Sequence, residues 1–206
     1  MEIRLQNIAK HFGREVVFQH VNITLASGSR TAILGPNGSG KSTLLQTIGG
    51  ALMPTSGTIQ HVLNGKGIDQ QEVYKHVSIA APYLGLYEDL SLQQCIAFHA
   101  RFKPFRPGIA ADDVPRIAYL EGALDKPVLH FSSGMKQRLK LALAILSDTP
   151  LLLLDEPASN LDAQAVAWYR ELLVQHVEGR TVLVASNRQA VEHEVCTAAS
   201  EMEGFK

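Results

Sequence analysis

The fold of this chain is decided by the stretch Gly35-Pro36-Asn37-Gly38-Ser39-Gly40-Lys41-Ser42-Thr43. A short run of β-forming residues, Arg30 to Leu34, precedes it, and Lys41 to Leu52 has the apolar spacing of a helix. Pro54 and the pair Ser56-Gly57 end that helix. A glycine-rich stretch that ends in Gly-Lys-Ser, between a strand and a helix, matches the P-loop pattern. The sequence therefore predicts a strand, a phosphate-binding loop and a helix, in that order.

The residue types of this loop suit the binding of a nucleotide triphosphate. Small residues let successive backbone N–H groups turn toward one anion, and the N-terminus of the following helix adds its dipole. Lys41 is expected to supply a positive charge to the β- and γ-phosphates, and Ser42 a hydroxyl to Mg²⁺. A glycine-rich surface turn would explain the composition as well, but the strand and helix on either side disfavour it.

A second candidate element is the apolar run Leu151 to Leu154, followed by Asp155 and Glu156. An unbroken apolar run is typical of a parallel strand that is buried on both faces. Ligands of open α/β sheets bind at the carboxyl ends of such strands. Asp155 is therefore a candidate for the magnesium shell, and Glu156, on the opposite side of the strand, could polarise a water that attacks the γ-phosphate.

Strands and helices alternate along the rest of the chain, which predicts an α/β fold with a mostly parallel sheet of the P-loop NTPase type. An antiparallel β part is expected at the N-terminus and an inserted helical subdomain in the middle. The core would comprise residues 1–81 and about 148–206, and the helical subdomain about 82–147. Further strands are predicted at Ile3 to Ile8, Val16 to Leu25, Gly57 to Leu63, Val77 to Ala81 and Thr181 to Ala185. Further helices are predicted from the cap Ser91 to about Arg101, over Asp112 to Glu121, over Ser133 to Leu146, and from the cap Asp162 to about His176.

Composition limits the possible functions. The chain has 206 residues, of which 46% are hydrophobic and 19% charged, so extended disorder is excluded. Nineteen basic residues nearly balance twenty acidic ones, which argues against a nucleic-acid partner. Two cysteines are too few for a disulfide framework and favour a reducing compartment. No apolar run reaches the length that spans a bilayer, so a membrane role is expected only through partners.

The motifs together resemble the ATP-binding cassette (ABC) family over nearly the whole chain. The loop Gly35 to Thr43 matches that family's phosphate-binding sequence, and Leu151 to Asp162 resembles its Walker B motif and D-loop. Ser132 and Gly134 occupy the place of the family signature, whose residues contact the γ-phosphate across a dimer. Phe12 stands where the family usually has an aromatic residue that stacks on adenine. The resemblance implies that these residues, with the loop, bind ATP.

Three positions depart from the family pattern. Met135 stands where the signature has a glutamine, and Pro82 falls at the place of the Q-loop glutamine. Asn187 replaces the switch histidine; its amide can donate a hydrogen bond to a γ-phosphate but cannot become cationic. Because a lost catalytic contact commonly costs a few kcal/mol of barrier, turnover about a hundredfold slow is expected.

The resemblance implies an ATPase, a cytoplasmic subunit held at the inner face of the cell membrane by transmembrane permease subunits. Its catalytic residues would be Lys41, Glu156 and Asn187. Its cofactors would be ATP and Mg²⁺, with the metal ion held by Ser42 and Asp155. A second ATP-binding domain would be its partner. One alternative is a module that dimerises on ATP but hydrolyses it poorly, as half of a heterodimer or as a regulator. A soluble ABC protein of translation or DNA repair and a P-loop kinase fit less well, the first because tandem domains and coiled coils are absent here. The sequence Asp-Glu-Pro after the strand argues for hydrolysis over transfer to a metabolite.

Overall fold

A computed structural model describes residues 1–205 and contains two β-sheets. One sheet is antiparallel and has the strand order β2-β1-β4-β5; the other is parallel and has the order β6-β7-β8-β3-β9. The antiparallel strands are β1 (Glu2–Phe12), β2 (Glu15–Leu25), β4 (Ser56–Leu63) and β5 (Lys66–Ile68). The parallel strands are β3 (Arg30–Leu34), β6 (Val77–Ala80), β7 (Leu151–Asp155), β8 (Thr181–Ser186) and β9 (Ala198–Glu201). The predicted α/β class, with an antiparallel part at the N-terminus, is confirmed.

The central strand β7 shows why the sheet needs cover on both faces. All five of its residues are buried. Leu151 and Leu153 belong to a core cluster with α1 and the antiparallel sheet, whereas Leu152 and Leu154 pack in a second cluster with α2, α4 and α5. Because successive side chains of a strand point to opposite faces, an unbroken leucine run fits only such a doubly covered strand.

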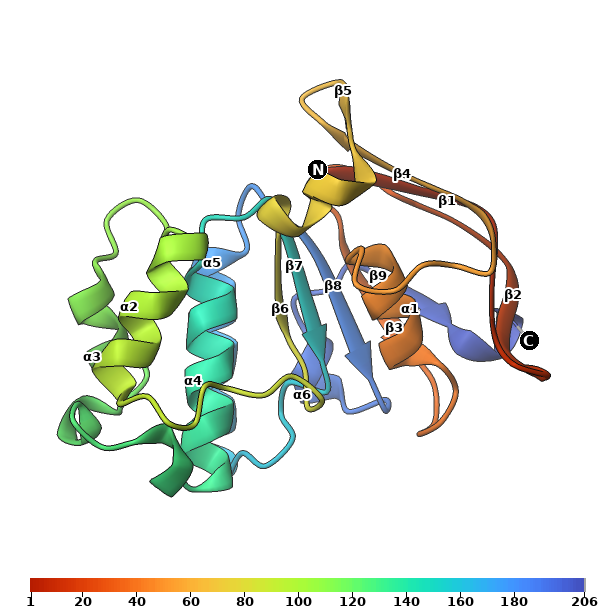
Figure 1. Ribbon diagram of the computed structural model, residues 1–206. Coiled ribbons are helices and arrows are strands. Elements are labelled where there is room, and N and C mark those ends of the chain that lie inside the picture. The colour runs from red at the N-terminus through yellow and green to blue at the C-terminus, as the bar shows by residue number, and fades with distance from the viewer. Residues whose placement is uncertain (206) are drawn as a thin grey trace.

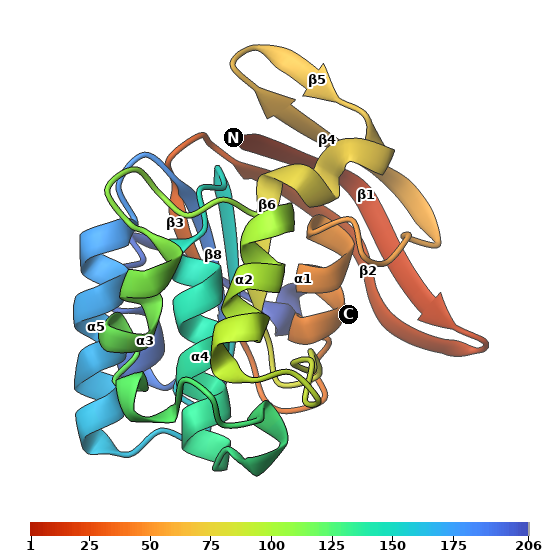
Figure 2. The same cartoon turned by 60° about the vertical axis from the view of Figure 1, so that its left-hand side comes forward.

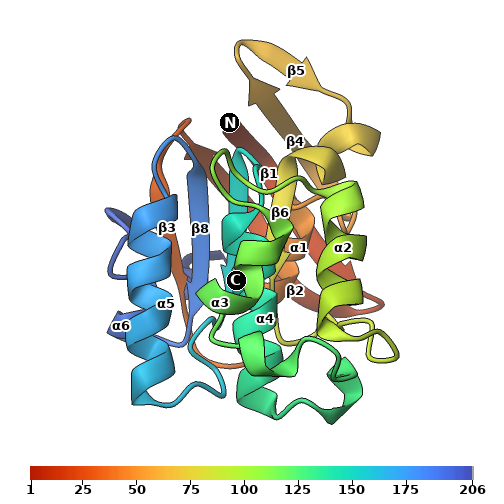
Figure 3. The ribbon, with the colours of Figure 1, turned by 90° about the vertical axis from the view of Figure 1, so that its left-hand side faces the viewer.

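Helices cover the two faces of the parallel sheet unequally. Helix α1 lies between the two sheets, while α2, α4 and α5 lie on the other side of the parallel sheet (Figure 1). The antiparallel sheet covers α1 (Figure 2). Seen from the left-hand side of Figure 1, α5, α4 and α2 stand next to one another (Figure 3). The α-helices are α1 (Lys41–Ile48), α2 (Leu92–Phe102), α3 (Val114–Ile117), α4 (Ser133–Leu146), α5 (Ala163–His176) and α6 (Ala190–His193). Short 3₁₀ helices cover Gln70–His76, Ala111–Asp113, Glu121–Ala123, Val128–His130 and Met202–Phe205.

Capping side chains fix the starts of the three long helices beside the sheet. The Ser91 hydroxyl accepts from the Gln94 N–H, and the Gln94 side chain accepts from the Ser91 N–H, so the predicted capping box opens α2. Ser132 caps α4 and Asp162 caps α5 with one hydrogen bond each, accepted from the N–H of Met135 and of Ala165. The bounds predicted for α4 agree with the structure to the residue.

Three predictions of local structure were wrong in part. Helix α1 ends at Ile48 instead of Leu52, because Gly49 follows as the cap and Gly50 takes a left-handed backbone with φ of 76°. The helix predicted over Asp112 to Glu121 is reduced to the four residues of α3 between short 3₁₀ turns. The short strands β5 and β9 were not predicted. Within residues 1–205, no helix has the length and apolarity needed to cross a membrane.

Candidate active site

The carboxyl ends of neighbouring parallel strands bring the predicted site residues to one edge of the sheet. Asp155, the last residue of β7, pairs with Ala185 of β8, and Ala185 in turn pairs with Ile33 of β3. The phosphate-binding loop therefore begins beside the end of β7. Ligands of open α/β sheets bind at this edge.

The loop between β3 and α1 wraps around the ammonium group of Lys41. That group is almost fully buried and donates hydrogen bonds to the carbonyl oxygens of Gly35, at 3.0 Å, and Pro36, at 3.1 Å. Gly40 caps α1 in the left-handed region, with φ of 100°, and a Cβ there would lie 2.7 Å from Cγ1 of Val17. Only glycine fits this position without strain. The lysine is thus held at the helix N-terminus, where an anion would be bound.

A cavity of about 320 Å³ opens over the loop. Its wall includes the predicted residues Phe12, Lys41 and Glu156. The Phe12 ring is half exposed at 52%, and Nζ of Lys10 lies 4.9 Å from its centroid. The remaining lining residues are Glu15, Val17, Asn37, Gly38, Ser39, Gly40, Ser42 and Thr43. An exposed aromatic face and a phosphate-binding loop thus share one cavity, as recognition of a nucleotide requires.

Asp155 is a buried carboxylate whose hydrogen-bonding capacity is unused. Its side chain is 1% exposed, and neither oxygen has a hydrogen-bond partner among the described residues. Burial raises the pKa of Asp155 and the nearby charge of Glu156 adds to this, whereas the Ser42 hydroxyl and the charge of Lys41 act in the opposite direction. An unpaired buried carboxylate beside a hydroxyl is a donor set that suits a hard cation such as Mg²⁺.

Glu156 differs from its neighbour in both backbone and environment. Its φ is +45°, in the left-handed region that a non-glycine residue rarely adopts, and its N–H donates to the carbonyl oxygen of Ala185 at 2.9 Å. Its side chain is 31% exposed, and Oε1 lies 3.7 Å from Nζ of Lys41. Glu156 therefore faces the cavity while Asp155 lies beneath it. The two side chains point in opposite directions, as was predicted for the pair.

Six predicted site residues do not line this cavity: Gly35, Pro36 and Asp155, already described, and three from other loops and helices. Ser132 is exposed at the start of α4, where its hydroxyl accepts from the Met135 N–H at 3.2 Å. Gly134, one residue into the helix, is so close to the Asn160 carbonyl oxygen that a Cβ would lie 3.4 Å from it. Asn187 is exposed in the loop after β8. Asn187 follows Ser186, which pairs with Leu34 just before the phosphate-binding loop, whereas Ser132 and Gly134 belong to α4 and its cap.

Tyr83 is a site residue that sequence reasoning missed. It follows Pro82, just past the end of β6, and Ala80 of β6 pairs with Leu154 next to Asp155. Burial raises the pKa of Tyr83 and the charge of Asp155 adds to this, while a hydrogen bond with Gln46 of α1 opposes it. A phenol thus lies near the Asp155 carboxylate beside the place where a glutamine was expected. No local pattern marks this tyrosine; only the strand register brings it there.

Two further missed residues, Gln137 of α4 and Glu192 of α6, are buried behind the site. Each makes a hydrogen bond to the backbone that follows Glu156. Burial raises the pKa of Glu192, while hydrogen bonds from Ser186 and Ala158 oppose the shift. Gln137 lies in the stretch Ser132 to Arg138 that occupies the place of the family signature, but nothing in that stretch indicated its contact with Pro157. Glu192 belongs to no recognised motif.

Comparisons with known proteins show what this chain is similar to. The profile of the ABC transporter family matches residues 18–159. The cytochrome c biogenesis ATP-binding export protein CcmA of Agrobacterium fabrum is 30% identical, covering 92% of this chain and 90% of its own. The sulfate/thiosulfate import ATP-binding protein CysA of Thermosynechococcus vestitus is 36% identical, covering 84% of this chain and 53% of its own. A dimeric structure of the ATP-binding cassette MJ0796, bound to ADP and Pi in a post-hydrolysis state, is 25% identical with a TM-score of 0.75, covering 92% of this chain and 90% of that one.

Proposed function

The chain belongs to the ABC transporter family, and from this premise we propose that two copies of it close around ATP and drive transmembrane partner subunits. It is an ATP-binding subunit of a transporter and an ATPase. The observation that carries the proposal is that Lys41 and Glu156, 3.7 Å apart, line one cavity and that the residue before Glu156 is the buried, unpaired Asp155 carboxylate. These are a cation for phosphate, a base for water and a ligand for a metal ion.

In the proposed complex, the backbone N–H groups of the loop Gly35 to Thr43 hold the phosphates and Lys41 neutralises the β- and γ-phosphate charge. The adenine stacks on Phe12, whose ring is exposed at the rim of the same cavity. Lys10, over that ring, would then lie beside the base or the ribose. Phe12 and the phosphate-binding loop line the same cavity, so one nucleotide could contact the ring with its base and the loop with its phosphates.

Mg²⁺ would be held by the Ser42 hydroxyl and the Asp155 carboxylate. When bound, it would neutralise charge on the β- and γ-phosphates. The fit rests on the two oxygens of Asp155, which are buried without hydrogen-bond partners among residues 1–205. A buried ionised carboxylate without a partner destabilises the folded chain until a cation arrives.

Replacing Asp155 with asparagine is expected to separate stability from metal binding. Without nucleotide, Asp155→Asn should have a higher Tm than the native chain, because burying a neutral amide costs less free energy than burying a carboxylate. Each kcal/mol gained in the free energy of unfolding raises Tm by about 2–4 °C. With ATP present, Mg²⁺ should raise the Tm of the native chain and leave that of the variant almost unchanged. Scanning calorimetry with ATP plus EDTA and with ATP plus Mg²⁺ measures both effects. An equal response of the two proteins to Mg²⁺ would refute the assignment of Asp155.

For hydrolysis, Glu156 is proposed to polarise the attacking water and Asn187 to donate a hydrogen bond to the γ-phosphate. Glu156 is already oriented into the cavity beside Lys41. An asparagine amide is a weaker electrostatic stabiliser than an imidazolium, so turnover is expected to be slow. The presence of Glu156 in this position favours slow hydrolysis over the hydrolysis-impaired alternative.

A dimer would bring Ser132 and Gly134 of one copy to the phosphate-binding loop of the other. Ser132 is exposed at the N-terminus of α4, where helix N–H groups and the helix dipole attract an anion. In a head-to-tail pair, Ser132 and Gly134 of one copy would cover the γ-phosphate on the loop of the other. Each copy carries both halves, so two identical chains would form two complete sites. The dimeric state of the cassette MJ0796 supports this arrangement.

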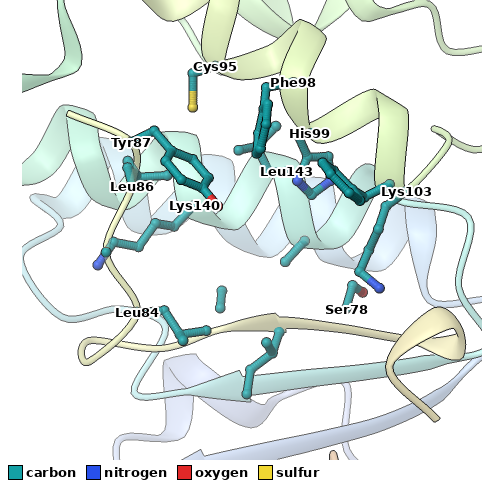
Figure 4. A pocket seen from close by; sticks show the side chains of 15 residues that line it. Ser78, Leu84, Leu86, Tyr87, Cys95, Phe98, His99, Lys103, Lys140 and Leu143 are labelled. Carbon is teal, nitrogen blue, oxygen red and sulfur yellow. The ribbon is translucent and has the colours of Figure 1, made fainter. Parts of the chain in front are cut away.

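The transmembrane partner is proposed to dock at an apolar pocket between β6 and helices α2 and α4 (Figure 4). The pocket has a volume of about 300 Å³, and Tyr87, Phe98 and Phe102 form a chain of ring contacts along it. Burial lowers the pKa of both Lys103 and Lys140, which also line it. A helical segment of a membrane subunit, with apolar side chains for the rings and an acid for the lysines, fits this chemistry. Its attachment would place the chain at the cytoplasmic face of the membrane.

Phe102→Asp is expected to release the protein from membranes. Phe102 is 68% exposed, so the charge should leave the fold intact while it opposes docking of an apolar helix. In fractionated cells that naturally make this protein, the native chain should sediment with the membranes and the variant should stay in the supernatant. Tyr119→Asp, which alters another exposed aromatic residue (56%) away from the pocket, serves as the control. Sedimentation of Phe102→Asp with the membranes would exclude this docking face.

A further inference from the structure

The peptide group between Pro157 and Ala158, in the turn that begins at Glu156, is held at both of its polar atoms by buried side chains. The Pro157 carbonyl oxygen accepts a hydrogen bond from Nε2 of Gln137 at 2.9 Å. The Ala158 N–H, on the other side of the same peptide bond, donates to Oε1 of Glu192 at 3.2 Å. Gln137 is 5% exposed and Glu192 is 1% exposed. We call this arrangement the peptide clamp.

The peptide clamp acts on a backbone that needs support. Glu156 has a left-handed φ of +45°, a backbone conformation that is strained for a non-glycine residue. On one side of this residue, its own N–H is fixed to Ala185 of β8 at 2.9 Å. On the other side, the Glu156 carbonyl oxygen accepts from the Ser159 N–H at 3.0 Å within the turn. The clamp adds the contacts that tie the Pro157–Ala158 peptide group of this turn to α4 and α6.

Glu192 also reaches the loop that carries Asn187. Its second oxygen, Oε2, accepts from the Ser186 hydroxyl at 2.5 Å, and Ser186 is the last residue of β8. The hydroxyl of Tyr169, on α5, donates to the Glu192 carbonyl oxygen at 2.7 Å. One buried carboxylate therefore joins the backbone after Glu156 to the residue before Asn187.

We propose that Gln137 and Glu192 are positioning residues for ATP hydrolysis, which hold Glu156 and the Asn187 loop in register with each other. The proposal rests on the proposed role of Glu156. Gln137 lies one turn into α4, the helix that begins with Ser132 and Gly134. The clamp thus connects three parts of the composite site: the helix that meets the other copy, the glutamate that activates water, and the loop after β8. Movement of α4 on dimer closure would reach Glu156 through one hydrogen bond.

The test compares Glu192→Ala with Glu192→Gln in steady-state ATP hydrolysis. Alanine leaves the Ala158 N–H and the Ser186 hydroxyl without the carboxylate. Glutamine keeps one oxygen for the Ala158 N–H, and the Ser186 hydroxyl can donate instead to the Gln189 carbonyl oxygen, 3.4 Å away. We expect kcat of the alanine variant to fall by about tenfold or more with KM for ATP within about twofold. The glutamine variant should keep kcat within about threefold of the native value.

A matched control and a second variant keep the test decisive. Glu194→Gln changes an exposed glutamate just past α6 that pairs with Arg170, and it should leave kcat unchanged. Gln137→Met keeps the length of the side chain, removes the donor to Pro157, and should lower kcat in the same selective way. The double variant Gln137→Met/Glu192→Ala should lower kcat by less than the product of the two single reductions, because Gln137 and Glu192 hold the same peptide group. If Glu192→Ala fails to fold, Gln137→Met alone decides.

Unchanged kcat in Glu192→Ala and Gln137→Met would overturn the proposal, and so would a parallel loss of ATP affinity that Glu192→Gln does not rescue. Glu156→Gln, measured in the same series, separates the two levels of inference. If that variant still turns over, the role of Glu156 itself fails. If it is inactive while the clamp variants are normal, only the clamp is refuted.

Discussion

Lys41→Ala is expected to lose about 100-fold in affinity for ATP, because a charged hydrogen bond to phosphate contributes about 1.5–3 kcal/mol. In the structure the Lys41 ammonium group is buried and held by the carbonyl oxygens of Gly35 and Pro36. It is therefore already in place at the loop, and little side-chain entropy is lost when the phosphates bind. Alanine removes this charge, so only the backbone N–H groups of the loop remain to bind the phosphates. Isothermal titration calorimetry with ATP measures the loss directly.

The control for this prediction is Lys66→Ala, which removes an exposed lysine from β5 and should bind ATP as the native chain does. Circular dichroism melts of both variants would show that the weaker binding does not reflect unfolding. Native affinity in a folded Lys41→Ala protein would contradict the assignment of the phosphate-binding loop.

Glu156→Gln is expected to bind ATP normally and to hydrolyse it about 10²–10⁴ times more slowly than the native chain, the range usual for a lost general base. Glutamine has almost the same shape, so the left-handed turn and the contact near Lys41 should survive. What it lacks is the negative charge that draws a proton from the attacking water. Phosphate release under saturating ATP and Mg²⁺ measures the rate, and a fluorescent ATP analogue measures binding.

Glu171→Gln, on the exposed face of α5, is the matched control and should hydrolyse ATP at the native rate. If Glu156→Gln keeps a rate within tenfold of native, another group must activate the water.

The parts of the site that were predicted from sequence are those whose chemistry is local in the chain. The phosphate-binding groups of the loop Gly35 to Thr43, its backbone N–H groups and Lys41, lie within nine consecutive residues. The local sequence pattern is therefore enough to predict phosphate binding. The run Leu151 to Leu154 indicates a doubly covered strand because it is short and unbroken and ends in two acids. The capped helices α2, α4 and α5 were predicted for the same reason, since a cap and its helix are neighbours in sequence.

What could not be predicted depends on contacts between distant segments. Strand β9 is short and half of its residues are alanine, so only its parallel pairing with β3 makes it a strand. Tyr83 approaches Asp155 because β6 lies next to β7 in the sheet. Glu192 is one acid in a polar segment, and its burial against the backbone after Glu156 arises only when α6 packs beneath β8. Such residues carry no local pattern because their partners are more than thirty positions away.

The central claim is that two identical chains complete each other's ATP site, and the mass of Glu156→Gln in solution tests it most directly. Light scattering after size exclusion should give about twice the 22.5 kDa of one chain when ATP is present, because bound ATP is not hydrolysed and joins the loop of one copy to Ser132 and Gly134 of the other. The mass should return to that of one chain with ADP, which lacks the γ-phosphate. A Glu156→Gln protein that binds ATP and remains a single chain at high concentration would contradict the account.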